Sequence, residues 1–371
     1  NVMIGNFAAS GLTTGSKNVA IGQGAGPRVG ATNNVAVGYQ AGSSVTSGTG
    51  NVAVGMYAGV TNTGEYNISI GYSSGASQSG SNNVSVGKEA LDSQTSTSGN
   101  VAVGYQAGTA NTTGDSLTAI GEDAAKANTT ADNITAIGAF ALDNNTTGAD
   151  NTAVGVNALG TNLTGGSNVA VGVDALSMNT TGDSNVALGV RALRRNTTGA
   201  TNAAIGFNAL GTNTTGSYNV ALGHNVMSMN TTGYRNTAIG YGSMTQSTTG
   251  FNNTALGYNA VNNNRDGEYN VGIGSDAFGN NMSGSKNIAI GSFALDNSES
   301  ESENIAIGYN AATANTTGSS ILALGFESLA NNTTGDLNTG IGYQSLLLNT
   351  TGSNNTAVGY KALKANTTGD R

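Results

Sequence analysis

The sequence predicts an all-β solenoid of 22 coils with a 17-residue repeat. A motif of the form Asn-Val-Ala-Val-Gly recurs along the chain, and its closing glycine appears 22 times, from Gly5 to Gly359. Successive closing glycines are 16 or 17 residues apart throughout. Self-similarity at a short fixed period is typical of repeat architectures in which each unit stacks on the next. We therefore interpret residues 1–371 as a single continuous repeat array.

The motif itself predicts a short strand. When the closing glycine is numbered position 0, position −1 always holds Val, Ile or Leu, and position −3 is mostly β-branched. Position −2 holds Ala, Ser or Gly in every repeat except at Met3. Side chains alternate along a strand, so positions −3 and −1 share one face and position −2 lies on the other. A column that admits only small residues indicates close packing, either by the other strand of the same coil or by another chain.

The rest of each repeat predicts a second short strand and two turns. Positions +2 to +6 carry Ala and, from Leu142 onward, usually Leu, which suits a strand that faces the first one. Positions +7 to +10 read Asn-Thr-Thr-Gly in most repeats after Gly104, and Asn and Gly are turn residues that tolerate positive φ. A unit of this size cannot bury its own apolar face, so successive coils are expected to stack.

Composition excludes several classes of function. The 371 residues include 13 Lys and Arg against 21 Asp and Glu, a net charge of −8, and 9% of the chain is charged. A protein that tracks nucleic-acid phosphates would instead show basic patches. The absence of cysteine excludes disulfides and thiolate metal sites, and a single histidine excludes a multi-histidine site. No apolar run approaches the ~20 residues of a membrane helix.

Several repeats resemble the head repeats of trimeric autotransporter adhesins, the YadA-like head. The strings that carry the resemblance are Asn51 to Gly55, Asn100 to Gly108 and Asn287 to Gly291. Similar repeats also occur in phage tail-fibre-like proteins. The resemblance implies a left-handed parallel β-roll, a homotrimer, and a surface-exposed fibre or adhesin without catalytic residues. The chain departs from that pattern in its 17-residue period, since the family's head repeat is shorter, and in lacking a recognisable neck, stalk or anchor.

Aromatic residues gather at position +1 and form a candidate glycan-binding ladder. The pairs Tyr241 with Tyr258 and Tyr343 with Tyr360 occupy consecutive repeats, so their rings are expected to stack. Such a strip could hold sugar rings, or it could only shield a corner of the coil.

Asparagine at position +7 creates N-glycosylation signals, because Asn-x-Ser/Thr is the acceptor sequence. On exposed turns these residues would be modified in a glycosylating host; alternatively their amides form a ladder from coil to coil. Eleven of them read Asn-Thr-Thr, and Asn162 and Asn281 carry the signal in two further repeats. The eleven are Asn111, Asn128, Asn145, Asn179, Asn196, Asn213, Asn230, Asn315, Asn332, Asn349 and Asn366.

Three other features could in principle carry chemistry. The segment from Gly22 to Gly26 has the glycine spacing of a phosphate loop, His224 stands in the +1 column, and Glu299, Glu301 and Glu303 alternate in one turn. The loop lacks a following helix, and the acidic residues lack partner ligands, so a structural role is the alternative for each. We expect no catalytic residue, no metal site and no cofactor.

These observations together predict a non-enzymatic extracellular fibre or adhesin segment, on a cell surface or a virion. The expected partner is a further copy of the chain, in a homotrimer or a head-to-tail filament, because both chain ends read as ordinary coils rather than caps. The alternative function is a head module that binds host or environmental glycans, or a receptor, through the aromatic column. Neither nucleic acid nor a membrane span is expected for this segment.

Overall fold

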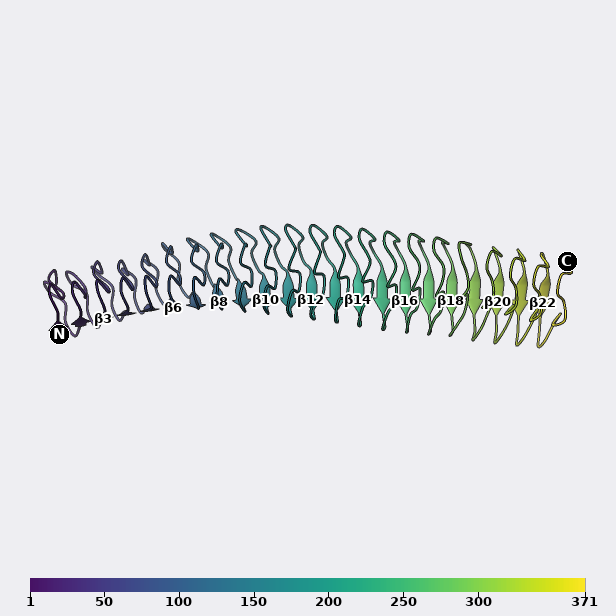
Figure 1. The fold of residues 1–371 in the computed structure, drawn as a ribbon, viewed down its shortest axis with the longest axis horizontal. Coiled ribbons are helices and arrows are strands. Elements are labelled where there is room, and N and C mark those ends of the chain that lie inside the picture. Colours follow the sequence, from purple (N-terminus) through teal and green to yellow (C-terminus); the bar gives the residue numbers. More distant parts are fainter. Residues whose placement is uncertain (371) are drawn as a thin grey trace. The chain divides into compact units, whose positions relative to one another are not determined.

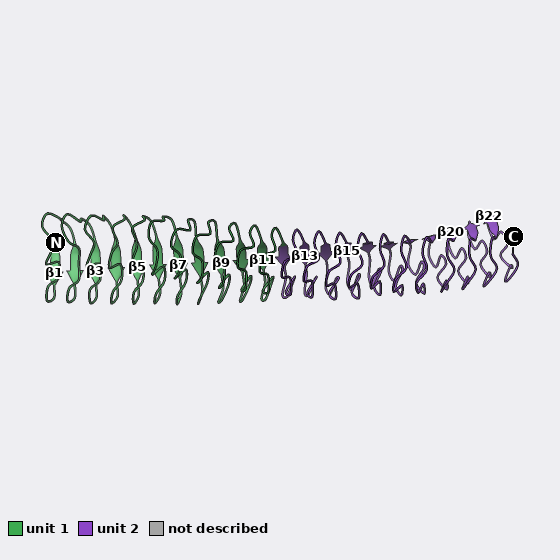
Figure 2. Cartoon of the chain, turned by 90° about the horizontal axis from the view of Figure 1, so that it is seen from above, with its two compact units in different colours: residues 1–185 green, residues 186–371 purple. Residues whose placement is uncertain are grey.

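The computed structural model describes residues 1–370, which contain 22 strands of three residues each and no helix. Figure 1 shows that each coil contributes one strand, and Figure 2 divides the chain into two compact units, residues 1–185 and 186–370. Each unit is a solenoid of parallel strands. Since the described residues form no helix, none of them provides a helical membrane span.

The strands of the two units fall at the predicted positions −3 to −1 of each repeat. The first unit contains β1 (Val2–Ile4), β2 (Val19–Ile21), β3 (Val35–Val37), β4 (Val52–Val54), β5 (Ile68–Ile70), β6 (Val84–Val86), β7 (Val101–Val103), β8 (Thr118–Ile120), β9 (Thr135–Ile137), β10 (Thr152–Val154) and β11 (Val169–Val171). The second unit contains β12 (Val186–Leu188), β13 (Ala203–Ile205), β14 (Val220–Leu222), β15 (Thr237–Ile239), β16 (Thr254–Leu256), β17 (Val271–Ile273), β18 (Ile288–Ile290), β19 (Ile305–Ile307), β20 (Leu322–Leu324), β21 (Thr339–Ile341) and β22 (Thr356–Val358).

Neighbouring strands pair in parallel and in the register of the repeat. In the first unit Ala153 of β10 lies opposite Ala170 of β11, and in the second unit Ala204 of β13 lies opposite Ala221 of β14. Each sequence column therefore becomes a column of side chains that runs along the stack. This confirms the parallel β-solenoid with a repeat of about 17 residues.

The small column at position −2 faces the interior of its own coil. Ala153 and Ala170 are fully buried, and so are Ala204 and Ala221. A Cβ placed on Gly42 at position +4 would lie 3.4 Å from the Cβ of Ala36 at position −2 of the same coil. The first of the two predicted alternatives is therefore correct: the segment that packs on the small column belongs to the same coil.

The predicted second strand is absent from the described coils. Positions +2 and +4 adopt left-handed backbone conformations, as at Phe140 (φ 59°) and Leu142 (φ 52°). The backbone N of Phe140 donates to the carbonyl of Glu122 in the preceding coil. The backbone N of Leu142 donates to the carbonyl of Ala158 in the following coil. The alternating conformation satisfies the backbone in both directions and turns Leu142 inward, where it is fully buried. Side-chain alternation alone could not distinguish this geometry from a strand.

The closing glycine is required by both conformation and space. Gly155 has a φ of 136°, which side chains with a Cβ rarely adopt, and a Cβ there would lie 2.6 Å from the carbonyl oxygen of Gly172. The glycine of Asn-Thr-Thr-Gly has a different role from the one predicted. Gly148 does not have a positive φ, but a Cβ on it would lie 2.2 Å from the carbonyl oxygen of Gly165. The turn therefore needs glycine for close approach of the next coil.

Candidate functional site

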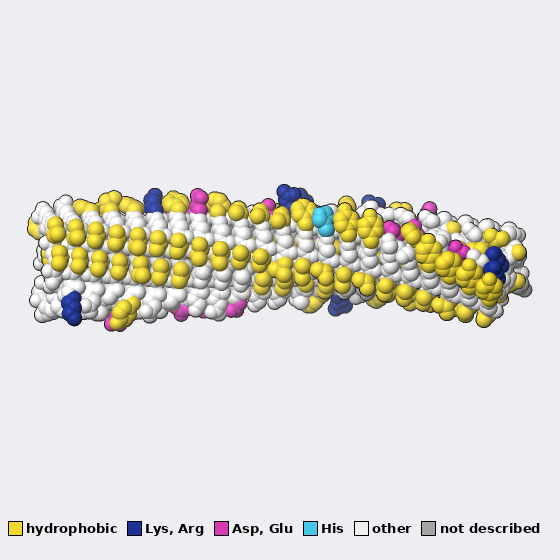
Figure 3. All heavy atoms as spheres, turned by 90° about the horizontal axis from the view of Figure 1, so that it is seen from below, with side chains coloured by type: hydrophobic (Ala, Val, Ile, Leu, Met, Phe, Trp, Pro, Cys, Tyr) yellow, Lys and Arg dark blue, Asp and Glu magenta, His cyan; other side chains and the backbone are white. Residues whose placement is uncertain are grey.

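The outward face of the strands exposes apolar side chains in each unit. Side chains at positions −3 and −1 point away from the coil, opposite to the buried position −2, and Figure 3 shows parallel rows of hydrophobic atoms along part of the stack. Position −1 is aliphatic in every repeat, while position −3 is threonine in seven of them. In the first unit Ile120 is 39% exposed and Ile137 is 37% exposed; in the second unit Leu222 and Leu256 are 42% and 45% exposed. We call the outward side chains of positions −3 and −1 the apolar face.

The repetition of the apolar face distinguishes it from scattered surface hydrophobics. Position −1 holds Val, Ile or Leu in all 22 repeats, including the exposed Val171 and Leu324. Soluble proteins rarely expose contiguous apolar patches larger than a few hundred Å², and larger ones mark interaction sites. The chemistry that suits a flat array of branched aliphatic side chains is the burial of another apolar surface.

The aromatic column at position +1 stacks as the sequence predicts. The rings of Tyr241 and Tyr258 lie 5.6 Å apart and nearly parallel, and those of Tyr343 and Tyr360 lie 5.3 Å apart. His224 continues the first ladder, stacked between Phe207 at 5.0 Å and Tyr241 at 5.3 Å. Neighbouring rings cover both faces of Tyr241 and Tyr343, the faces that a sugar ring would need, whereas Tyr258 and Tyr360 end their ladders and have a ring on one face only. The geometry therefore favours the structural interpretation of the ladder.

The asparagines at position +7 lie inside the coil and not on exposed turns. Asn145 is fully buried, and its Nδ2 donates to Oδ1 of Asn128 at 3.1 Å and to the carbonyl of Gly148 at 3.0 Å. The same burial applies to the predicted acceptors from Asn111 to Asn349, while Asn366 is half-buried and its Nδ2 donates to Asn349 at 3.0 Å. This corrects the expectation of exposed acceptors, since a glycan on the amide nitrogen would displace these bonds. The alternative, an asparagine ladder, is what the coils contain.

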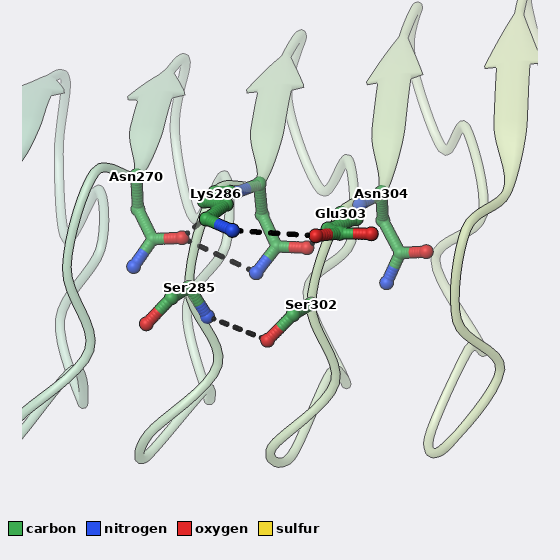
Figure 4. Close-up of polar contacts among 7 residues, drawn as sticks. Asn270, Ser285, Lys286, Ser302, Glu303 and Asn304 are labelled. Atoms are coloured by element: carbon green, nitrogen blue, oxygen red, sulfur yellow. Dashed lines mark hydrogen bonds and ion pairs between the residues drawn. The ribbon is translucent and has the colours of Figure 1, made fainter.

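A second asparagine ladder, which we did not predict from the sequence, runs along position −4. In the second unit Oδ1 of Asn270 accepts from the backbone N of Asn287 at 3.0 Å and from its Nδ2 at 3.2 Å, as Figure 4 shows. Oδ1 of Asn287 in turn accepts from the backbone N of Asn304 at 3.0 Å. The signal was present in the sequence, because position −4 is Asn in 19 of the 22 repeats.

The three glutamates of the candidate acidic cluster have three different environments and do not converge on one site. Glu303 forms an exposed ion pair with Lys286 at 3.4 Å (Figure 4), while Glu301 is buried and accepts from the hydroxyl of Ser298 and from the backbone N of Ser300. Glu299 has no side-chain partner among residues 1–370. The described residues contain no group of three or more His, Asp or Glu side chains placed to hold a metal ion.

The glycine-rich segment from Gly22 to Gly26 covers positions 0 to +4 of a single coil. Gly22 is a closing glycine with a φ of 131°, and Gly24 and Gly26 also have positive φ. Gln23, Gly24 and Arg28 line a surface hollow of about 370 Å³ in the first unit. The turn leads into no helix, so it lacks the N-terminal dipole on which a phosphate loop depends.

In each unit a half-buried aspartate at position +5 lies near an aspartate at position +2 of the preceding coil. Burial, and then the neighbouring carboxylate of Asp276, raise the pKa of Asp296. In the first unit burial and the nearby Asp123 likewise raise the pKa of Asp143, although Lys126 opposes the shift. Lys126 pairs with Asp123 at 3.2 Å. Asp143 and Asp296 are therefore partly shielded from water and lie beside another carboxylate, and Lys126 near Asp143 is the cation that offsets this.

Comparisons with protein-family models, with curated proteins and with solved structures give no match to this chain.

Proposed function

We propose that this chain is a non-enzymatic extracellular structural fibre or adhesin segment in which identical copies associate through the apolar face. The single observation that supports this most strongly is the outward column at position −1, which holds Val, Ile or Leu in every repeat. Self-association would bury these columns, and repetition at the period of the solenoid lets the same contact recur at every coil.

The finer description of the assembly follows from the resemblance to YadA-like head repeats. On that basis we propose a left-handed roll, a homotrimer around a threefold axis, and a place on a cell surface or a virion; head-to-tail growth into a filament is the other arrangement of copies. The glycan-binding alternative through Tyr241, Tyr258, Tyr343 and Tyr360 is less favoured, because the ring faces cover one another.

Analytical ultracentrifugation of matched variants tests the proposal. The double variant Ile137→Lys and Val154→Lys places cations on the apolar face, whereas Val156→Lys and Val173→Lys places them at position +1 of neighbouring coils. We expect the parent and the +1 variant to sediment at three times the mass of one chain, and the apolar-face variant at the mass of one chain. A monomeric parent at all concentrations would refute the proposal.

A further inference from the structure

A surface groove in the second unit lies where three consecutive coils lose the threonine at position +8. The groove has a volume of about 820 Å³, within the usual size of ligand sites. One wall is formed by position +6, with Gln246, Asn263, Asn280 and Asn297. The other wall is formed by position +8.

Position +8 explains why the groove opens here. In flanking coils it is a threonine whose hydroxyl donates to the next coil, as Thr231 does to the carbonyl of Thr248 at 3.1 Å. In the three central coils it is Arg265, Met282 and Glu299, all exposed, with Met282 50% exposed. These longer side chains cannot repeat the threonine contact, so they extend along the surface.

The charged groups of the groove are free to bind a ligand. Arg265 and Glu299 are two coils apart, ~10 Å at the spacing of strands, and form no ion pair with each other. Among residues 1–370 neither side chain has a hydrogen-bond partner, and the same holds for the amide of Gln246. Asn280 accepts from Asn263 at 3.0 Å, which leaves the Nδ2 donors of Asn280 available.

The groove offers side-chain groups and no free backbone donors along its walls. The backbone N of Asn263 donates to Gly279 at 3.0 Å, that of Asn280 to Asp296 at 3.1 Å, and that of Arg265 to Met282 at 2.9 Å. An extended peptide that binds by strand addition needs such donors unpaired. The side chains of the groove instead suit a ligand with pairs of hydroxyl groups, because amides, a guanidinium and a carboxylate all form hydrogen bonds to hydroxyls. The Met282 thioether suits the apolar C–H face of a sugar ring.

We propose that this groove binds an uncharged linear glycan that lies along the stacking direction. The amide wall repeats once per coil, and one ring of an extended glycan advances by a similar length, so each successive ring meets one amide side chain. Nδ2 of Asn263 donates to Asn280 and Nδ2 of Asn297 donates to the carbonyl of Thr313, both at 3.0 Å, whereas among residues 1–370 Nε2 of Gln246 and Nδ2 of Asn280 remain free to donate. Arg265 and Glu299 bind hydroxyl pairs at the two ends, and their opposite charges leave the site near neutrality. The site uses positions +6 and +8, and thus differs from both the apolar face and the aromatic column.

Isothermal titration calorimetry tests the proposal. The ligands are two β-1,4-linked tetrasaccharides, one of N-acetylglucosamine and one of glucose. The variant Arg265→Thr, Met282→Thr and Glu299→Thr restores the residue found at position +8 in most flanking coils, so the fold is expected to persist. We expect the parent to bind at least one tetrasaccharide, and the triple variant to bind it at least about tenfold more weakly, because two charge-assisted contacts are lost. Leu163→Thr makes the same kind of change at position +8 of the first unit and should leave binding unchanged.

Two results would overturn the inference: neither tetrasaccharide binds the parent, or the triple variant retains the parent's affinity. Asn280→Ala, which removes the free amide from the other wall, gives an independent check and should also weaken binding. The apolar-face variant Ile137→Lys and Val154→Lys should bind the glycan as the parent does, so failure of the groove and failure of self-association are distinguishable.

Discussion

Nδ2 of Asn162 donates to Oδ1 of Asn145 at 2.8 Å, and Oδ1 of Asn162 accepts from Nδ2 of Asn179 at 2.7 Å. Each amide thus acts as donor and acceptor toward opposite neighbours, so the direction of the ladder is the same in every coil that carries it. All three residues are fully buried. This arrangement requires an amide and cannot be met by a carboxylate.

Replacing Asn162 by Asp should therefore destabilise the first unit severely. The carboxylate would face two acceptors, Oδ1 of Asn145 and the carbonyl of Gly165, and an uncompensated buried charge costs about 3–5 kcal/mol. Urea unfolding at neutral pH measures the loss. Because burial would raise the pKa of the new carboxyl, part of the stability should return at acidic pH. The same change at the half-buried Asn366 should cost much less.

Because the −2 column faces inward, a larger side chain should destabilise the protein at position −2 and be tolerated at position +1. Ala170→Leu should lower the free energy of unfolding by roughly 1–3 kcal/mol, because Ala170 is fully buried in a filled interior. Val173→Leu, at the 45% exposed position +1 of the same repeat, should be nearly silent. Thermal unfolding of the two variants compares them, and equal tolerance would contradict the assigned facing.

An exposed residue in the left-handed conformation should be replaceable by asparagine with a gain in stability, because asparagine adopts this conformation at lower cost. Leu337 at position −5 has a φ of 55° and is 58% exposed, whereas the equivalent residue in other coils is often Asn or Asp. Leu337→Asn should raise the free energy of unfolding by ~1 kcal/mol, since Asn tolerates this conformation better. Leu329→Asn is the contrasting variant: Leu329 has a φ of 51° but is fully buried, so its replacement should destabilise the unit.

The aspartate pair of the second unit should make stability depend on pH. Because burial and Asp276 raise the pKa of Asp296 in the folded chain, its stabilising contribution is complete below the ordinary aspartate pKa of about 3.9 and is lost as pH rises through the folded value. Asp296→Asn should therefore stabilise the protein at pH 7 and have little effect at pH 3. Unfolding curves at the two pH values decide this, and an equal effect at both would exclude the carboxylate as the cause.

The repeat and its strand were predictable because glycine spacing and strand alternation are local signals. The stacked pairs Tyr241 with Tyr258 and Tyr343 with Tyr360 followed directly from the period. The second strand was predicted wrongly, since inward Ala and Leu at positions +3 and +4 fit both an extended chain and the alternating left-handed path observed at Phe140 and Leu142.

The two surface features that support the proposals needed the structure. The exposure of Ile137 depends on which face of the strand turns outward, and side-chain alternation shows only that Thr135 and Ile137 share a face opposite to Ala136. The groove was missed although its signal was present: Arg265, Met282 and Glu299 interrupt a column of threonines in consecutive repeats. Only the fold places these three side chains beside the amides of position +6.

The register of one repeat per strand has an evolutionary consequence. Because Ala153 pairs with Ala170 as Ala136 pairs with Ala153, the gene can gain or lose a segment that encodes one whole coil and leave the remaining pairings intact. Unequal recombination between near-identical segments produces such changes directly. Selection can therefore change the number of stacked coils in steps of one repeat. The −4 ladder also persists across the 16-residue spacings from Asn18 to Asn34 and from Asn51 to Asn67, so a coil can lose one residue and keep this ladder in register.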